Sequence, residues 1–275
     1  MLQEGYFDKV YYRLWQSSKD NKPLANIFAI HGLGGHSTWF DKAAQKFNEQ
    51  NINFFSLDLP GFGQSKYPRG KVESYKVWLD VTRDALEKYL KTFNVNAPVF
   101  ILGHSMGALI AILLSKSVRA HGWILAVPAF EGYPDTFPLS KFILPVLCKS
   151  LVNPEEEIMV PFGPELLTKN KETQLEVKKD PFRFIKLSAE IYKHVFFLTR
   201  CAKTPPIIIN GPVLMLIAGK DKVCSNEHME IYFEKTQCEN KVKKIYPDSF
   251  HDLFLEDEMP EVVSDITDWI KEHCK

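Results

Sequence analysis

The sequence lacks a net charge and a long apolar run. Lys and Arg together number 34, as do Asp and Glu, so the formal net charge is zero. Without a basic excess the chain has little electrostatic attraction for nucleic acid, and we expect no nucleic-acid partner. No run reaches the roughly 18 consecutive apolar residues that a membrane-spanning helix needs. The most apolar segment, residues 137–152, is interrupted by Lys141, Pro145 and Lys149.

The sequence also lacks closely paired cysteines. It has five, an odd number, and none stands in a Cys-x-x-Cys pair. Neither a disulfide framework nor a zinc site is therefore predicted. Residues 1–20 contain no basic segment followed by an apolar core, so we expect no signal peptide. These features favour a reducing compartment, and we predict a cytoplasmic protein that associates peripherally with membranes.

What is present is typical of a folded enzyme of the α/β class. Apolar residues make up 45% of the 275 residues and charged residues 25%. Short apolar runs alternate with segments of helical periodicity, as expected when a mostly parallel sheet is covered by helices on both faces. Strands are predicted at 10–15, 26–30, 53–58, 98–102, 123–127, 213–218 and 242–246. Helices are predicted at 38–50, 75–93, 106–117, 227–235 and 262–270.

One segment, residues 129–209, breaks this alternation and is rich in Pro, Phe, Leu and Lys. It is too long for a structureless loop within a compact fold. We therefore predict a helical cap over the strand ends, inserted into a core made of residues 1–128 and 210–275. Ligands of such sheets bind at the C-terminal ends of the strands, which is the end that the cap would cover.

The strongest local signal is the sequence Gly-His-Ser-Met-Gly at 103–107. It follows the predicted strand 98–102 and precedes a predicted helix, which is the context of a nucleophile elbow. In that motif a sharp turn exposes a serine hydroxyl at the top of the sheet. A glycine-rich turn without chemistry is the alternative, but the position between strand and helix favours Ser105 as a nucleophile.

A serine nucleophile needs a base and an acid that orients the base. In α/β-hydrolases the order along the chain is Ser, then acid, then His. Asp221 follows the predicted strand 213–218, and His251 follows the predicted strand 242–246. We therefore predict a triad of Ser105, Asp221 and His251. The alternatives for the acid are Asp248, Asp252 and Asp257.

Acyl transfer also needs hydrogen-bond donors for the developing oxyanion. The backbone amide of Met106 directly follows the nucleophile and begins a predicted helix, whose dipole favours negative charge. The second donor is expected from the loop after the strand 26–30, where the sequence at 31–35 is His-Gly-Leu-Gly-Gly. We predict the amide of Leu33 as that donor.

Several motifs together resemble one family. These are the sequences at 31–37, 57–65, 68–70, 103–107, 180–181, 219–221 and 251–253. Their order is similar to that in the monoacylglycerol lipases and related lysophospholipases, from about residue 11 to about residue 270. The resemblance implies an α/β-hydrolase fold, serine ester hydrolysis and a monoacylglycerol or lysophospholipid substrate. At Gly35 members of this branch commonly carry a Glu that lines the polar end of the site, so the contacts with glycerol are expected to differ here.

The apolar segment of the cap gives an independent indication of the substrate. Residues 137–152 are apolar nearly all round, which is wider than the stripe of an ordinary surface helix. Such a segment either packs on the core or lines a channel for an acyl chain, with contact to a lipid surface. For the channel we predict substrate contacts by Phe142 and Leu147, together with His104 of the elbow. Cys201 and Cys224 are predicted as inert core thiols, with a position near the site as the alternative.

We therefore predict a serine hydrolase that cleaves carboxylic esters of long-chain acyl lipids. Its partner is a small acyl ester or lipid, and the chemistry needs no metal or organic cofactor. The oligomeric state is not predicted. A general carboxylesterase, an amidase or an acyl thioesterase is the alternative, because one triad serves all of them. A hydrolase-fold binding protein without activity is the alternative outside enzymes, but it would be expected to lack a triad member.

Overall fold

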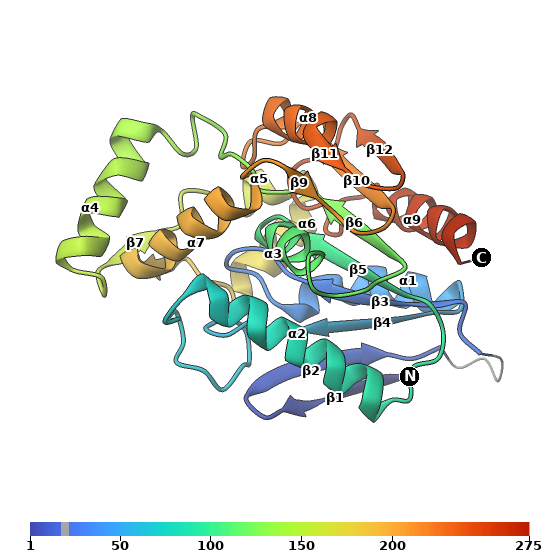
Figure 1. Ribbon diagram of the computed structural model, residues 1–275. Helices are drawn as coiled ribbons and strands as arrows, with labels where there is room; N and C mark the ends of the chain where they lie inside the picture. The colour runs from blue at the N-terminus through green and yellow to red at the C-terminus, as the bar shows by residue number, and fades with distance from the viewer. Residues whose placement is uncertain (18–21, 275) are drawn as a thin grey trace.

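The computed structural model describes residues 1–17 and 22–274 and is centred on an eight-stranded sheet (Figure 1). The order of the strands is β1-β2-β4-β3-β5-β6-β10-β12. The pairs β1–β2 and β2–β4 are antiparallel and the remaining neighbours are parallel. The bounds are β1 Leu2–Phe7, β2 Val10–Trp15, β3 Ala25–Ile30, β4 Ile52–Leu57, β5 Val99–His104, β6 Gly122–Ala126, β10 Val213–Ala218 and β12 Lys241–Tyr246.

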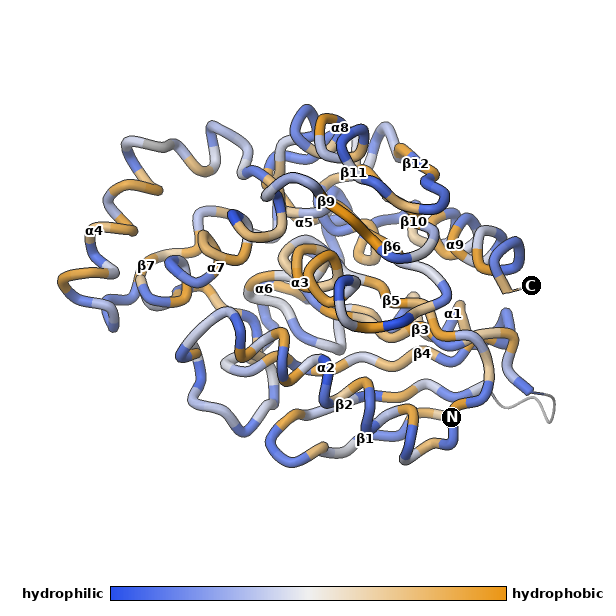
Figure 2. Tube along the Cα trace, in the orientation of Figure 1, coloured by the Kyte–Doolittle hydropathy of each residue, from blue (hydrophilic) through white to orange (hydrophobic). Residues whose placement is uncertain are grey.

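The central strands are buried on both sides because helices cover both faces of the sheet. Every residue of β3, β5, β6 and β10 is buried. Helices α1 and α9 pack together behind the sheet in Figure 1, and α2 and α3 pack together in front of it. Figure 2 shows the hydrophobic colour along β6 and around α3. The bounds are η1 Ser37–Phe40, α1 Asp41–Glu49, α2 Tyr75–Thr92, α3 Met106–Leu114, α8 Asn226–Lys235 and α9 Met259–His273.

This architecture confirms the predicted α/β class with a mostly parallel sheet. Strand β1 differs from the prediction, which began the sheet at residue 10. Its residues alternate between exposed and half-buried, so no apolar run marks it. It is a strand because it pairs with β2 across a tight turn in which Asp8 has a φ of 53°. Pairing with a neighbour, rather than burial, stabilises this edge of the sheet.

The segment 129–209, which we call the cap, is helical in most of its length but contains short strands as well. Strands β7 (Glu157–Met159) and β8 (Lys186–Ser188) pair antiparallel, and β9 (Ile207–Ile208) pairs with β11 (Thr236–Gln237). The apolar segment forms a π-helical turn, η2, and helix α4. Figure 1 shows α4 and α7 projecting from one end of the sheet. The helical bounds are η2 Leu139–Ile143, α4 Leu144–Val152, α5 Pro164–Leu167, α6 Lys171–Lys179 and α7 Ala189–Ala202.

Neither a membrane-spanning helix nor a disulfide framework is expected from the sequence. In the described parts of the chain, no helix combines the length and the hydropathy that crossing a membrane requires. All five cysteines lie within those parts and are unpaired.

Candidate active site

The elbow places Ser105 in a strained turn between β5 and α3. Its backbone has a φ of 54° and a ψ of −114°, a conformation that a residue with a side chain rarely adopts. The turn is enclosed closely, since a methyl group on Gly107 would lie 2.1 Å from the carbonyl oxygen of Ile30. The amide of Ser105 donates to the carbonyl of Ala126 in the neighbouring strand β6. These contacts hold the hydroxyl at the C-terminal edge of the sheet.

The structure brings together the three residues predicted as the triad. Ser105 Oγ lies 3.0 Å from His251 Nε2, and His251 Nδ1 lies 2.8 Å from Asp221 Oδ2. The other carboxylate oxygen of Asp221 accepts hydrogen bonds from the amides of Val223 and Cys224, at 2.7 Å and 2.9 Å. All three side chains are nearly inaccessible to solvent. The chain of contacts has the arrangement in which a serine gives its proton to an oriented imidazole.

The electrostatic surroundings favour a charged imidazole at His251. Burial alone would lower its pKa, but the nearby Asp221 carboxylate, the hydrogen bond to it and the charge of Asp252 together raise the pKa above its usual value of 6.5. The imidazolium that forms when His251 accepts a proton is therefore stabilised by Asp221. The pKa of His104 moves the opposite way, mainly because burial disfavours its charged form.

The two predicted oxyanion donors flank Ser105. Within residues 1–17 and 22–274, the amides of Leu33 and Met106 donate to no backbone carbonyl outside regular helices and strands. Both residues line the same cavity as Ser105. A methyl group on Gly32 would lie 3.1 Å from Ser105 Cβ, so the loop that carries Leu33 packs directly on the elbow. Both amides are thus available to an acceptor that enters beside Ser105.

The loop is supported from below by Asp58. One carboxylate oxygen of Asp58 accepts a hydrogen bond from the amide of Ser37 at 2.7 Å, and the other accepts one from the amide of Gln64 at 2.7 Å. A side chain on Gly63, whose φ is 53°, would collide with this carboxylate. Asp58 therefore holds the end of the loop in place, although the sequence marks it only as part of a motif.

His104 takes a different position from the two other predicted substrate contacts. Its ring lies 5.4 Å from that of His251, and its Nε2 lies 3.8 Å from Asp252 Oδ2. It is 5% exposed and does not line the cavity at Ser105. The structure thus places the His104 ring against that of His251, outside the cavity.

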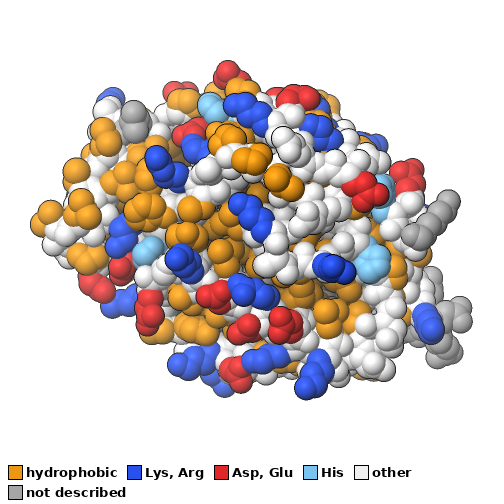
Figure 3. Space-filling model, viewed as in Figure 1, with side chains coloured by type: hydrophobic (Ala, Val, Ile, Leu, Met, Phe, Trp, Pro, Cys, Tyr) orange, Lys and Arg blue, Asp and Glu red, His pale blue; other side chains and the backbone are white. Residues whose placement is uncertain are grey.

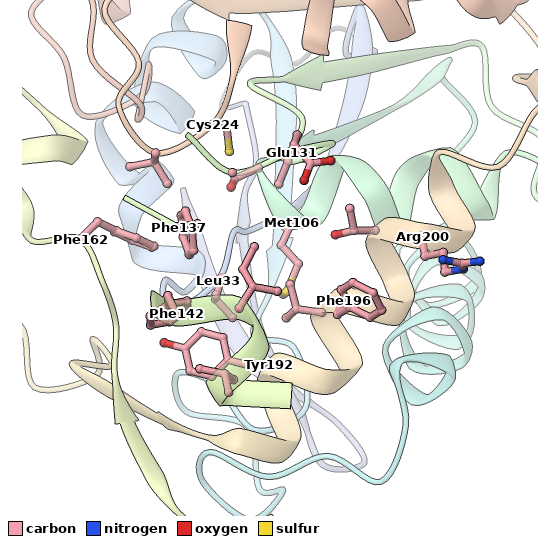
Figure 4. A pocket seen from close by; sticks show the side chains of 18 of the residues that line it. Leu33, Met106, Glu131, Phe137, Phe142, Phe162, Tyr192, Phe196, Arg200 and Cys224 are labelled. Carbon is pink, nitrogen blue, oxygen red and sulfur yellow. The ribbon is translucent and has the colours of Figure 1, made fainter. Parts of the chain in front are cut away.

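Phe142 and Leu147 line a cavity of about 260 Å³ that opens above Ser105. Most of the side chains around it are apolar and come from the cap. Figure 4 shows Phe137, Phe142 and Tyr192 grouped on one side of Leu33 and Met106. Phe137 and Phe142 contact each other edge to face, as do Phe142 and Tyr192. This part of the cavity is suited to an alkyl chain rather than to a polar group.

The other side of the cavity is polar and was not predicted from the sequence. This side is lined by Glu131, Arg200 and Lys203. In Figure 4, Arg200 lies on the side of the cavity opposite to Phe137, Phe142 and Tyr192. Lys203 Nζ contacts Glu131 Oε2 at 2.5 Å. Among the described residues, no carboxylate lies within ion-pair distance of Arg200. Arg200 is exposed, and within the described parts of the chain its charge has no carboxylate partner at this end of the cavity. No sequence motif marks it, since the residues lie on separate elements.

Cys224 lies at the site, which was the less favoured alternative for this thiol. It is buried, lines the cavity and contacts the Ser105 hydroxyl. Burial and the Asp221 charge raise the pKa of the thiol well above its usual value. Ligand atoms of Asp221, Cys224 and His251 lie within 4.8 Å of one another, but a metal there would have to displace the hydrogen bonds of the triad. A protonated thiol is also a poor metal ligand.

Two carboxylates, the half-buried Asp180 and the buried Glu256, tie the cap to the site. Asp180 Oδ2 of the cap lies 2.6 Å from His36 Nε2 and accepts from Trp39 Nε1 at 2.8 Å. Its other oxygen accepts from the Phe182 amide. Four residues further, the amide of Phe184 donates to the carbonyl of Gly34, in the loop that carries Leu33. The cap thereby contacts the loop that carries Leu33.

Glu256 forms the second tie. Its Oε1 accepts from the amide of Phe250 at 2.7 Å and from the amide of Lys169, in the cap, at 3.1 Å. Its Oε2 accepts from the Thr168 hydroxyl at 3.0 Å. Phe250 directly precedes His251, so Glu256 connects the loop that carries His251 to the cap. Neither Glu256 nor Asp180 is recognisable from the sequence as a coupling residue, since the partners are distant in the chain.

Comparisons with known proteins agree with this geometry. A family model described as serine aminopeptidase S33, a hydrolase family, matches residues 21–258. The monoglyceride lipase of Homo sapiens is 26% identical over 94% of this chain and 84% of its own. Phospholipase YtpA of Bacillus subtilis is 26% identical over 89% of this chain and 94% of its own. A soluble variant of monoglyceride lipase from Saccharomyces cerevisiae, solved with a substrate analogue, superposes with a TM-score of 0.87 at 19% identity, covering 100% of this chain and 96% of that one.

Proposed function

The chain belongs to the serine aminopeptidase S33 family of α/β-hydrolases, and from that membership we propose that it is a serine ester hydrolase acting on long-chain monoacylglycerols. One observation carries the proposal: Ser105, hydrogen-bonded to His251, opens into a cavity whose walls are mostly apolar. Relatives named monoglyceride lipase in several organisms support the choice of substrate. The proposal includes the roles of the site residues.

In the first half of the reaction Ser105 attacks the ester carbonyl while His251 Nε2 accepts its proton. Asp221 orients the imidazole and stabilises its charge. The amides of Leu33 and Met106 hydrogen-bond to the developing oxyanion, and interactions of this kind supply about 3 kcal/mol of transition-state stabilisation per donor. The imidazolium then gives its proton to the leaving alcohol, and the acyl group stays on Ser105.

In the second half water attacks the acyl-enzyme. His251 accepts a proton from the water, and the same two amides receive the second oxyanion. Ser105 regains its proton from His251 as the fatty acid leaves.

We assign the two parts of the substrate to opposite sides of the cavity, according to the residues that line each side. The aromatic group around Phe142 would hold the alkyl chain, whose burial contributes about 0.8 kcal/mol per methylene. Leu147 would lie along the same chain. His104, which packs behind His251, would act on the substrate only through the position of the imidazole.

Hydrolysis of p-nitrophenyl esters of increasing chain length, followed by a panel of monoacylglycerols, tests this proposal. We expect kcat/KM to rise with chain length and to be highest for a long-chain monoacylglycerol. Leu147→Trp, which narrows the apolar side, should shift the optimum to shorter chains, whereas Leu151→Trp, on the exposed side of the same helix, should leave it unchanged. We call the cavity at Ser105 the acyl cavity. An optimum at acetate in all three proteins would refute the proposal that it binds the acyl chain.

Lysophospholipids are a second candidate substrate class, favoured by the positive end of the cavity. Arg200 has no carboxylate partner among the described residues, and it would contact the alcohol part of a bound ester. A phosphate in that part would pair with the guanidinium. Arg200→Gln should then lower kcat/KM for a lysophospholipid and leave that for a monoacylglycerol unchanged. A similar decrease for both substrates would argue against a phosphate contact.

We also propose that the protein is cytoplasmic and contacts lipid surfaces through the cap. Leu144, Leu151 and Val152 of α4 are 50%, 81% and 88% exposed. Figure 3 shows hydrophobic side chains gathered over the α4 and α7 end of the molecule. Large apolar side chains this exposed are typical of membrane contact sites. Sedimentation with neutral liposomes should decrease in a Leu151→Ser/Val152→Ser variant and stay constant in Lys91→Gln, far from the cap.

A further inference from the structure

A second cavity, of about 900 Å³, lies in the cap on the far side of Phe162. One wall is a single face of α6, formed by Lys171, Gln174, Leu175 and Lys178, which are spaced three, four and seven residues apart. The remaining lining residues are Met159 at the end of β7, the segment 160–165 that follows it, and Arg183 and Ile185 just before β8. We call this cavity the groove. Phe162 lines both the groove and the acyl cavity, so a single aromatic side chain stands between them.

The groove combines exposed apolar side chains with an excess of positive charge. Met159, Leu175 and Ile185 are 57%, 57% and 56% exposed. The charged side chains of its wall are Lys171, Lys178, Arg183 and Glu165. Three cations thus face one carboxylate. A ligand that matches this wall carries a negative group and an alkyl chain in the same molecule.

Arg183 has the environment that most clearly requires an anion. It is half-buried, and its guanidinium donates one long hydrogen bond, 3.4 Å, to the carbonyl of Phe162. In the described parts of the chain, no carboxylate lies within ion-pair distance of it. Glu165 and Asp180 attract it only from farther away, and burial lowers the pKa of the guanidinium from its ordinary value. A carboxylate bound beside Arg183 would compensate this desolvated charge.

We propose that the groove binds a long-chain carboxylate, with the carboxylate on Arg183 and Lys178 and the alkyl chain on Met159, Leu175 and Ile185. The choice of a fatty acid as the occupant rests on the proposed function, because that reaction releases one beside Phe162. Product would then bind next to the acyl cavity without filling it, and inhibition by fatty acid would include a component that is not competitive with substrate.

Calorimetric titration of the full chain with monomeric laurate tests the proposal. Leu147→Trp, or Phe142→Trp if the first variant does not fold, narrows the acyl cavity and leaves the groove intact. We expect laurate to bind these variants. Adding Arg183→Gln and Lys178→Gln should weaken that binding about tenfold or more, since each removes a charge-assisted contact to the carboxylate. Butyrate, which lacks a long chain, should bind weakly to all of them.

Lys179→Gln is the matched control, because Lys179 is exposed on the same helix beside Lys178 but does not line the groove. Laurate should bind this variant as it binds the parent. The proposal would be overturned if laurate no longer bound the Leu147→Trp and Phe142→Trp variants. It would also be overturned if the loss of Arg183 and Lys178 left laurate binding unchanged. Vesicles of phosphatidylglycerol form a separate arm: if the charge variants lose vesicle binding and keep laurate binding, the groove contacts an anionic membrane instead.

Parallel assays of monoacylglycerol hydrolysis separate this inference from the proposed function. Laurate binding in the groove without hydrolysis would refute the proposed function and leave the anion site in place. Hydrolysis without binding in the groove would refute the inference alone. Arg183→Gln/Lys178→Gln should hydrolyse ester at the parent's initial rate and lose the non-competitive part of laurate inhibition.

Discussion

The elbow and the cap meet at one cavity but are built in opposite ways. At the elbow and in the two loops that face it, the side chains of Ser105, Asp221 and His251 are 6%, 3% and 2% exposed. Their polar atoms are hydrogen-bonded to one another or to backbone amides. In the cap, large apolar side chains of α4 and α6 face solvent. The difference agrees with the division of roles proposed above, in which the core maintains one reaction geometry and the cap offers apolar surface.

Removing the nucleophile is the largest expected perturbation of the elbow. Ser105→Ala should lower kcat by about 10⁴-fold to 10⁶-fold, because members of a triad act as one unit. A fluorophosphonate probe should label the parent and not the variant. Ser117→Ala, just beyond the C-terminal end of α3, should be labelled like the parent. Labelling of Ser105→Ala at the parent's rate would place the nucleophile elsewhere and remove the basis of the comparison.

A methyl group at Gly107 tests how closely the elbow is packed. It would lie 2.1 Å from a backbone oxygen of β3, and no side chain can move to relieve the contact. Gly107→Ala should therefore destabilise the protein by about 3 kcal/mol or more. Urea unfolding measures the change. A small substitution on the exposed side of the cap, Ser140→Ala, should change the stability by less than about 0.5 kcal/mol. Equal midpoints would show that the elbow is no tighter than the cap.

The pH dependence of hydrolysis tests the electrostatics of His251. Only the neutral imidazole can accept the Ser105 proton, so kcat/KM should rise with pH through the pKa of His251. The carboxylate of Asp221 helps to raise that pKa, and the rise should therefore be centred above 6.5. Asp221→Asn removes the charge and should move the centre to lower pH while lowering the plateau. A centre that does not move in this variant would contradict the assignment of Asp221.

The smallest expected effect concerns the tie between cap and core. Burial opposes ionisation of Asp180, but hydrogen bonds from His36, Trp39 and Phe182 outweigh it and lower its pKa to about 2. Its contribution to stability is therefore complete above the ordinary value of 3.8 and is lost as the pH falls through about 2. At neutral pH Asp180→Asn should cost about 1 to 2 kcal/mol in thermal or urea unfolding.

The exposed ion pair between Lys42 and Glu176 is the control for Asp180, because it also links the core to the cap. Its two side chains are 60% and 55% exposed. Glu176→Gln should change the stability by less than about 0.5 kcal/mol, since water screens such pairs. If the two variants were equally stable, the tie through Asp180 would be no stronger than a surface contact.

The sequence predicted the core well because local patterns determine it. Apolar runs mark the buried strands, and the placement of Ser105, Asp221 and His251 after strand ends predicted that they would share a site. Strand β1 escaped prediction because partner pairing rather than burial stabilises it. The ties through Asp180 and Glu256 and the charge of Arg200 could not be predicted, because their partners are far apart in the chain. The orientation of His104 depends on how the elbow turns, which the motif alone does not reveal.

The hydrogen bonds of Glu256 bear on how this enzyme can be re-engineered. One carboxylate joins Thr168 and Lys169 of the cap to the amide that precedes His251. A chimera that exchanged residues 129–209 for those of a relative would thus change the contacts of Glu256 with Thr168 and Lys169. The loop that carries His251 would lose that support. A graft that keeps residues 166–170 from the host would preserve that support. Crossover points for such chimeras should accordingly lie outside residues 166–170.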